Sequence, residues 1–165
     1  MDENKPRVLV VDDEPNNLRL MMQILQDQCD MAFATNGEEA LEAAEKLEPD
    51  LILLDVMMPE MDGFAICERL KDDGRTRDIP IIFLTAKTDA DSIVKGFELG
   101  AYDYVTKPFI SQELLARVRS RLQEKAMKDV LLERYEKIKE LEAMRESLTH
   151  MIIHDLKNPL SGITG

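Results

Sequence analysis

The chain has 165 residues, 44% hydrophobic and 33% charged, which suits one domain of ordinary size with an appended segment. Of the formal net charge of −12, residues 1–110 contribute −13 from 24 acidic and 11 basic side chains, and residues 111–165 contribute +1 from 9 and 10. The acidic first part disfavours nucleic-acid binding, the two cysteines show no metal-ligand spacing, and no apolar run approaches the ~18 residues of a membrane span, so we expect a cytoplasmic protein.

Strands and helices alternate along residues 1–110. Short apolar runs predict strands at 7–11, 31–34, 51–55, 81–84 and 104–105. Helical spacing of apolar side chains predicts helices at 16–28, 40–47, 64–70 and 89–99, and a last one that Ser111 caps. The alternation predicts an α/β fold with a doubly wound, five-stranded parallel sheet in the flavodoxin-like order 2-1-3-4-5.

The strand predicted at 51–55 ends in a carboxylate. Its four large aliphatic residues, bounded by Pro49 and Pro59, are typical of a strand buried on both faces, and Asp55 follows them directly. Because the crevice of an open parallel sheet lies at the carboxyl ends of its strands, Asp55 is a candidate for chemistry. Taken alone, it could equally well end or cap the strand.

Further polar side chains follow the other strands. Asp12 and Asp13 follow the first strand, Thr85 the fourth and Lys107 the fifth. In the 2-1-3-4-5 order the first and third strands flank the topological switch point, so Asp12, Asp13 and Asp55 should converge. Three close carboxylates repel one another unless a cation neutralises them, and oxygen ligands without His or Cys favour Mg²⁺. The alternative is that surface loops keep the three acids apart.

This set of side chains fits phosphoryl transfer. With Mg²⁺ bound, the Asp55 carboxylate could attack phosphorus and form an aspartyl phosphate. The cation would bridge Asp55 and the phosphoryl oxygens, while the Lys107 ammonium and the Thr85 hydroxyl would each contact another oxygen. Taken singly, Lys107 could be a solvated surface lysine and Thr85 an ordinary strand-end hydroxyl, so the hypothesis rests on the joint pattern.

Four motifs carry a family resemblance. VLVVDDEP, LILLDVMMPEMDGF, IIFLTA and DYVTKPF occur in the order and spacing of the response-regulator receiver domain of two-component systems, which residues 6 to about 120 resemble. The resemblance implies that Asp55 accepts a phosphoryl group from a phosphohistidine. It also implies that Asp13, Asp55 and the Met57 carbonyl bind Mg²⁺, with Asp12 contributing through water.

The same resemblance implies a switch. Thr85 would be the switch residue, Lys107 the phosphate contact and Tyr104 the switch aromatic, and the Lys107–Pro108 bond should be cis. Without the resemblance, Tyr104 is a half-buried tyrosine and the bond before Pro108 an ordinary trans turn. Phosphorylation would draw Thr85 and Tyr104 inward and change the surface that packs on the helix from Ser111.

That last helix is predicted to be unusually long. No Gly or Pro occurs between Ser111 and Pro159, and apolar residues recur in a coiled-coil-like but irregular pattern at Leu131, Tyr135, Ile138, Leu141, Met144, Leu148 and Met151. A single helix would leave this stripe in water, so we expect a parallel homodimer; the alternative is a stripe folded back on the receiver. The predicted divisions are a receiver domain at 1–122, a coiled-coil linker helix at 123–147 and a final segment at 148–165.

The final segment resembles part of another family. HMIIHDLKNPLSGI is similar to the H-box of a sensor histidine kinase, which implies that His154 is phosphorylated, that Asp155 assists as base, and that Asn158 orients water for dephosphorylation of a partner. A helical His is otherwise an ordinary surface or core residue. We therefore expect 148–165 to be the truncated start of a dimerisation and phosphoacceptor helix, which Pro159 would bend.

The favoured function is two-component phosphorelay signalling by a fragment of a receiver-histidine kinase, whose receiver signals through the dimeric helix to a kinase core. These 165 residues contain no Gly-rich nucleotide-binding domain, so the chain itself would catalyse only phosphorylation and dephosphorylation of its own Asp. Its partner would be a phosphohistidine donor protein or the kinase core. The alternatives are a phosphorylation-independent dimerising scaffold and a haloacid-dehalogenase-like phosphohydrolase, which usually carries a second Asp where Met57 stands.

Overall fold

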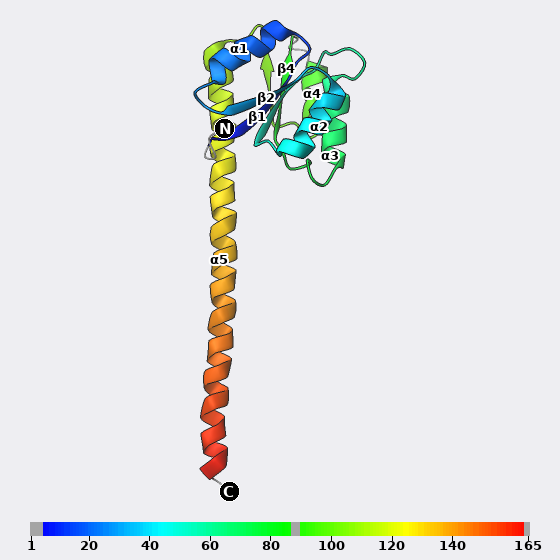
Figure 1. Cartoon of the computed structure of the whole chain (residues 1–165). Coiled ribbons are helices and arrows are strands. Elements are labelled where there is room, and N and C mark those ends of the chain that lie inside the picture. The colour runs from blue at the N-terminus through cyan, green and yellow to red at the C-terminus, as the bar shows by residue number, and fades with distance from the viewer. Residues whose placement is uncertain (1–4, 87–89, 164–165) are drawn as a thin grey trace. The chain divides into compact units, whose positions relative to one another are not determined.

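The computed structural model describes residues 5–86 and 90–163, with side chains as far as Asn158. The chain divides into two compact units, 1–123 and 124–165. The first unit contains five strands, β1 Arg7–Val11, β2 Asp30–Ala34, β3 Leu51–Asp55, β4 Ile81–Thr85 and β5 Asp103–Thr106. Its helices are α1 Pro15–Leu25, α2 Gly37–Leu47, α3 Gly63–Asp72, α4 Ala90–Glu98 and the beginning of α5, Ser111–Ile163 (Figure 1).

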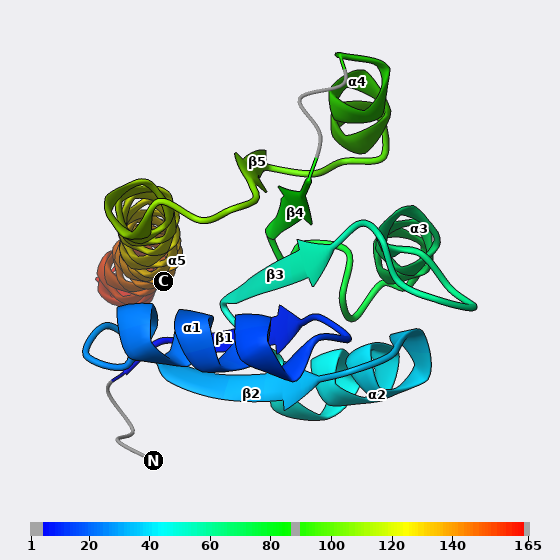
Figure 2. The ribbon, with the colours of Figure 1, turned by 90° about the horizontal axis from the view of Figure 1, so that it is seen from above.

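The five strands form one parallel sheet in the order β2-β1-β3-β4-β5, as predicted. In Figure 2, α1 and the start of α5 lie on one side of the sheet, and α2, α3 and α4 lie on the other. Val8 and Val10 of β1 belong to the core beneath α1 and α5, whereas Leu9 and Val11 belong to the core beneath α2 and α3. Because helices cover both faces, the inner strands β3 and β4 are buried along their whole length.

The helix starts follow from capping chemistry. The Asn36 side chain accepts from the Glu39 N–H at 2.9 Å, and the Asp62 side chain accepts from the Ala65 N–H at 2.8 Å. Ser111 is the first residue of α5 and not its cap, because the first helical bond runs from the Leu114 N–H to the Ile110 carbonyl.

Other boundaries differ slightly from the prediction. Helix α1 ends at Leu25 and not at residue 28. The Gln28 and Cys29 N–H groups both donate to the Leu25 carbonyl, which closes the helix with a turn. Strand β2 begins at Asp30, one residue earlier than predicted. Residue 89, at the start of the fourth predicted helix, lies outside the described residues.

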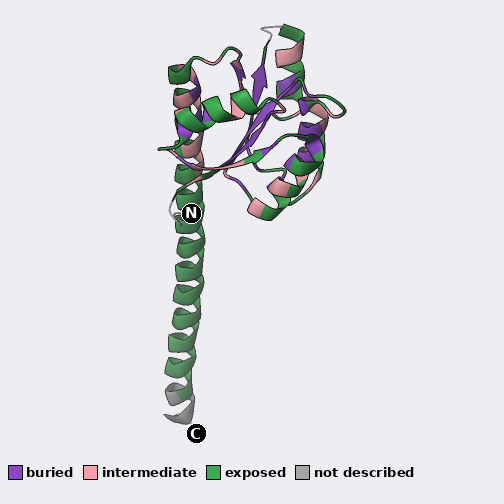
Figure 3. Cartoon of the chain, turned by 45° about the horizontal axis from the view of Figure 1, so that its top comes forward, coloured by how far each residue is buried: buried purple, intermediate pink, exposed green. Residues whose placement is uncertain are grey.

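In the second unit, α5 is one continuous helix that passes through Pro159 to Ile163. None of its described side chains, at 124–158, is buried (Figure 3). The apolar stripe predicted from the sequence is more than half exposed along its whole length, at Leu131, Tyr135, Ile138, Leu141, Met144, Leu148 and Met151. Within the described part of the chain, no helix combines the length and the hydropathy that crossing a membrane requires.

Candidate functional site

Three strand ends bring charged side chains to one edge of the sheet. Asp55 is the last residue of β3, Asp12 follows β1, and Lys107 follows β5. Parallel pairing of Val11 with Leu54 holds β1 beside β3 at this edge. As a result Asp12, Asp13 and Asp55 each offer a carboxylate oxygen, and these oxygens all lie within 4.8 Å of one another.

The acidic cluster has the chemistry of a hard-cation site. Asp12 and Asp55 are only 0% and 3% exposed, and Asp13 is the most exposed of the three. Its ligands would all be oxygens, a set that suits Mg²⁺ better than zinc. The Asp12 carboxylate is fixed by the Glu14 N–H at 2.9 Å and by Asn17 Nδ2 at 3.1 Å. Asn17 was not singled out from the sequence, although a polar residue in the first turn after Asp12 was the available signal.

Lys107 joins the two buried carboxylates. Its Nζ lies 3.0 Å from Asp12 Oδ2 and 3.1 Å from Asp55 Oδ1, and its side chain is 19% exposed. Burial alone would lower the pKa of Lys107, but the hydrogen bond to Asp12 and the charges of Asp55 and Asp12 outweigh it and raise the pKa. Lys107 is therefore a fixed cation in contact with both carboxylates.

The surroundings of Asp55 disfavour its ionised form. Burial and then the neighbouring Asp12 charge raise the pKa of Asp55 from 3.8 to about 6, although Lys107 and the Met57 N–H act in the opposite direction. Without a metal the anionic form of Asp55 is destabilised. Such a carboxylate gains from an added cation and is available as a nucleophile.

Close approach of α3 to Asp55 depends on a glycine. The Gly63 N–H donates to the Val56 carbonyl at 2.9 Å, and a Cβ added at Gly63 would overlap the Asp55 carbonyl oxygen. The helix can therefore begin directly against the end of β3 only with glycine at this position. The sequence pattern alone does not reveal this role of Gly63.

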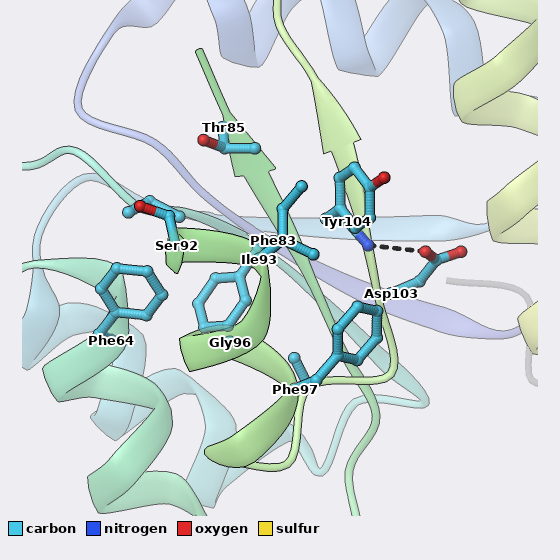
Figure 4. A pocket seen from close by; sticks show the side chains of 11 residues that line it. Phe64, Phe83, Thr85, Ser92, Ile93, Gly96, Phe97, Asp103 and Tyr104 are labelled. Atoms are coloured by element: carbon cyan, nitrogen blue, oxygen red, sulfur yellow. Dashed lines mark hydrogen bonds between the residues drawn. The ribbon is translucent and has the colours of Figure 1, made fainter. Parts of the chain in front are cut away.

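Thr85 and Tyr104 line one small pocket between β4, β5, α3 and α4 (Figure 4). Thr85, 7% exposed, ends β4, and Tyr104 lies on β5. The Phe97 ring of α4 meets the Tyr104 ring edge-on, with centroids 6.2 Å apart. In Figure 4 the Tyr104 hydroxyl points away from Thr85.

Two further predicted residues stand beside the acids. The Met57 N–H donates to Asp55 Oδ1 at 3.3 Å, and Met57 is 71% exposed. The Lys107–Pro108 peptide bond is cis, as the family resemblance implied, and the Lys107 N–H donates to the Thr85 carbonyl at 2.7 Å.

The three residues of the H-box-like motif lie in the second unit, on exposed turns of α5. Asn158 Nδ2 is 3.5 Å from His154 Nδ1, and the nearest Asp155 oxygen is 3.7 Å from that same nitrogen. Both contacts are long, and neither neighbour orients the ring closely.

Comparison with known proteins identifies the first unit. A family model of the response regulator receiver domain matches residues 8–119. The chain belongs to the response-regulator receiver family. Its receiver acts in two-component signalling, in which receiver domains take phosphoryl groups from histidine kinases.

The curated relatives of this chain include proteins of different function. Over 123 residues, 74% of this chain and 53% of the relative, it is 46% identical to the DNA-binding response regulator MtrA of Mycolicibacterium smegmatis. A probable cyclic di-GMP phosphodiesterase of Vibrio cholerae is 40% identical over 146 residues, 88% of this chain and 33% of the relative. The chain thus spans about half or less of the length of these curated relatives.

One solved structure similar to the receiver comes from a kinase. The signal receiver domain of a signal transduction histidine kinase from Syntrophus aciditrophicus superposes with a TM-score of 0.66 at 37% identity, covering 72% of this chain and 91% of that one. Receivers similar to this one therefore occur in proteins of more than one kind.

Proposed function

We propose that this receiver accepts a phosphoryl group from phosphohistidine on Asp55, with Mg²⁺ held by Asp12, Asp13, Asp55 and the Met57 carbonyl. The observation that carries the proposal is the meeting of Asp55 with two further carboxylates and the Lys107 ammonium at one strand edge. A carboxylate nucleophile, a cation site and a fixed ammonium are the parts that phosphoryl transfer requires.

The chemistry follows from the side chains. An Asp55 oxygen attacks phosphorus, the phosphorus–nitrogen bond of the donor breaks, and its electron pair returns to the imidazole nitrogen. Bound Mg²⁺ would neutralise charge on the carboxylates and phosphoryl oxygens. Lys107, which in this structure lies 3.1 Å from Asp55, pairs with one phosphoryl oxygen, and the Thr85 hydroxyl donates to another.

Transfer from a protein donor tests this proposal. A kinase core or phosphotransfer protein carrying radiolabelled phosphohistidine should pass its label to this chain in the presence of Mg²⁺. The Asp55→Ala variant, or chelation of Mg²⁺, should leave the label on the donor. Labelling of the Asp55→Ala variant at the rate of the unchanged chain would overturn the assignment.

The Met57 side chain should set the lifetime of the phosphoryl group. Met57 is exposed and lies two residues beyond Asp55, whose Oδ1 accepts from the Met57 N–H, so its apolar side chain would impede a water molecule approaching phosphorus in line. Met57→Asn should speed hydrolysis several-fold, which the decay of phosphorylated protein would report. Met127→Asn, at a Met exposed to a similar degree on α5, serves as the control, and equal lifetimes for Met57→Asn and the unchanged chain would refute the idea.

We also propose that α5 forms a parallel homodimer through the stripe that begins at Leu131. Exposed apolar side chains at coiled-coil-like spacing support this, since a second helix would remove them from water. Ile138→Lys should weaken the dimer about tenfold or more, because each copy loses one buried aliphatic side chain.

Sedimentation equilibrium measures that change. Glu136→Lys, two residues away on the opposite side of the helix, introduces the same charged group and should leave the association constant nearly unchanged. A monomeric unchanged chain, or equal effects of Ile138→Lys and Glu136→Lys, would contradict the dimer.

Finally, we propose that the receiver at 1–122 is linked by a helix at 123–147 to the start of a histidine kinase phosphoacceptor helix at 148–165. The motif around His154 and the occurrence of a similar receiver in a histidine kinase support this. An ATP-loaded kinase core supplied in trans should phosphorylate His154, with Asp155 as base. Asn158 would orient water in a separate reaction, the dephosphorylation of a partner. His150→Gln should retain the phosphohistidine and His154→Gln should lose it; the opposite pattern would reject His154.

A further inference from the structure

The Tyr104 ring contacts side chains of two helices. The Phe97 ring of α4 meets it edge-on, with centroids 6.2 Å apart. The Arg117 guanidinium of α5 lies 5.7 Å from the centre of the Tyr104 ring. A cation at this distance from an aromatic face is attracted by the ring quadrupole. The position of Tyr104 is thus tied to α5 as well as to α4.

Arg117 is itself anchored on the strand that carries Tyr104. Its Nη1 donates to Asp103 Oδ2, while the other Asp103 oxygen accepts from the Tyr104 N–H at 2.8 Å. Arg117 Nε also reaches Glu113 on the preceding turn of α5 at 3.3 Å. Because Asp103 and Glu113 both bind the Arg117 guanidinium, its position relative to the Tyr104 ring is fixed.

The pocket beside Tyr104 is too small for its ring. It offers about 10 Å³, room for about one water molecule, between Thr85, Ile93 and Tyr104. Inward movement of Tyr104 therefore requires both that the pocket enlarge and that the ring leave Arg117. The first change depends on Thr85 and α4, and the second on α5.

We propose that Arg117 is a positioning residue that restrains Tyr104 in its outward orientation and so couples the state of the switch to α5. This inference rests on the proposed phosphorylation of Asp55 and on the expectation from the family resemblance that phosphorylation draws Thr85 and Tyr104 inward. If Arg117 favours the outward state, removing it raises the inward population, and any ligand selective for the inward state binds more tightly by the same factor. The chain also contains a matched contact, because the Arg121 guanidinium lies 4.4 Å from the Tyr102 ring, outside the pocket.

The test compares Arg117→Met with Arg121→Met. Both variants keep an unbranched apolar stem and remove one guanidinium from one tyrosine ring. Ring-labelled tyrosine NMR, which must resolve only three tyrosines, reports the orientation of Tyr104 without ligand. Titration with beryllium trifluoride and Mg²⁺, a phosphoryl analogue, reports the affinity of the switched state. Circular dichroism confirms that both variants are folded.

Arg117→Met should shift the Tyr104 ring signals toward those of the analogue-bound state and tighten analogue binding about two- to fivefold, the equivalent of one partly exposed cation–π contact. Arg117→Lys, which keeps a cation, should restore most of the unchanged behaviour, and Arg121→Met should alter neither readout. Unshifted Tyr104 signals in Arg117→Met, or equal shifts in Arg121→Met, would overturn the inference. Should the unchanged chain fail to bind the analogue, the proposed function fails, and the ligand-free Tyr104 signals still decide the role of Arg117.

Discussion

Lys107→Met should disable the receiver more severely than any other change outside the acids. The variant retains an unbranched stem but removes the ammonium that lies 3.0 Å from Asp12 and 3.1 Å from Asp55. Without this cation the charge that builds on a transferring phosphoryl oxygen has no ammonium partner, and we expect phosphoryl uptake to slow by about 100-fold or more. Rapid-mix measurement of phosphoprotein formation with excess donor gives the rate.

The same variant should be less stable when Mg²⁺ is absent. Two buried carboxylates lose their shared partner, which costs about 3 kcal/mol in similar buried pairs. Added Mg²⁺ should recover part of this loss because it supplies a replacement cation. Lys46→Met provides the control, since Lys46 forms a solvent-exposed pair with Glu42 on one helix and should change neither rate nor stability. Uptake by Lys107→Met at the unchanged rate would remove Lys107 from the mechanism.

Asp55→Asn should abolish phosphorylation and at the same time stabilise the metal-free protein. Asp55 has its pKa raised from 3.8 to about 6, chiefly by burial and then by Asp12. Between pH 3.8 and about 6, Asp55 holds its proton in the folded protein but has released it in the unfolded chain. Stability therefore falls as the pH rises from about 4 to about 6 and then stays low, with a total loss of about 3 kcal/mol.

Asn mimics the protonated carboxyl and cannot ionise, so the variant lacks this penalty. In chelator, urea unfolding at pH 7.5 should give Asp55→Asn a free energy of unfolding about 3 kcal/mol above the unchanged chain, and the difference should vanish near pH 4. Mg²⁺ should narrow the gap at pH 7.5 by stabilising the carboxylate form. If the difference in free energy of unfolding does not depend on pH, or if the Asn variant is less stable at pH 7.5, the folded protein does not disfavour ionisation of Asp55.

The fold could be predicted because its determinants are local and repetitive. Continuous apolar runs such as residues 51–54, separated by capped helices, specify a parallel sheet covered on both faces. The convergence of Asp12 and Asp55 then follows, since the strands that precede them are neighbours and parallel strands share one carboxyl edge. The family motifs predicted features that apolar periodicity alone does not determine, such as the cis bond before Pro108.

Contacts between distant side chains could not be predicted in the same way. The two ion pairs of Lys107, the hydrogen bond from Asn17 to Asp12 and the placement of Arg117 on Tyr104 depend on rotamers and on how three elements pack. The raised pKa of Asp55 likewise depends on burial, which sequence spacing does not specify. These contacts determine the charge around Asp55 and the packing around Tyr104, whereas the sequence pattern determines only where these residues lie.

The most direct test of the central claim is whether the pocket is chemically competent without any partner protein. Intact and peptide mass should be measured after incubation with Mg²⁺ and a small phosphodonor such as acetyl phosphate, for the unchanged chain and for Asp55→Ala. We predict one added phosphoryl group on the peptide that contains Asp55, absent from Asp55→Ala and absent in chelator. A phosphoryl group on another residue would contradict the account. So would the absence of any phosphoryl group, if the chain also accepts no label from a phosphohistidine donor.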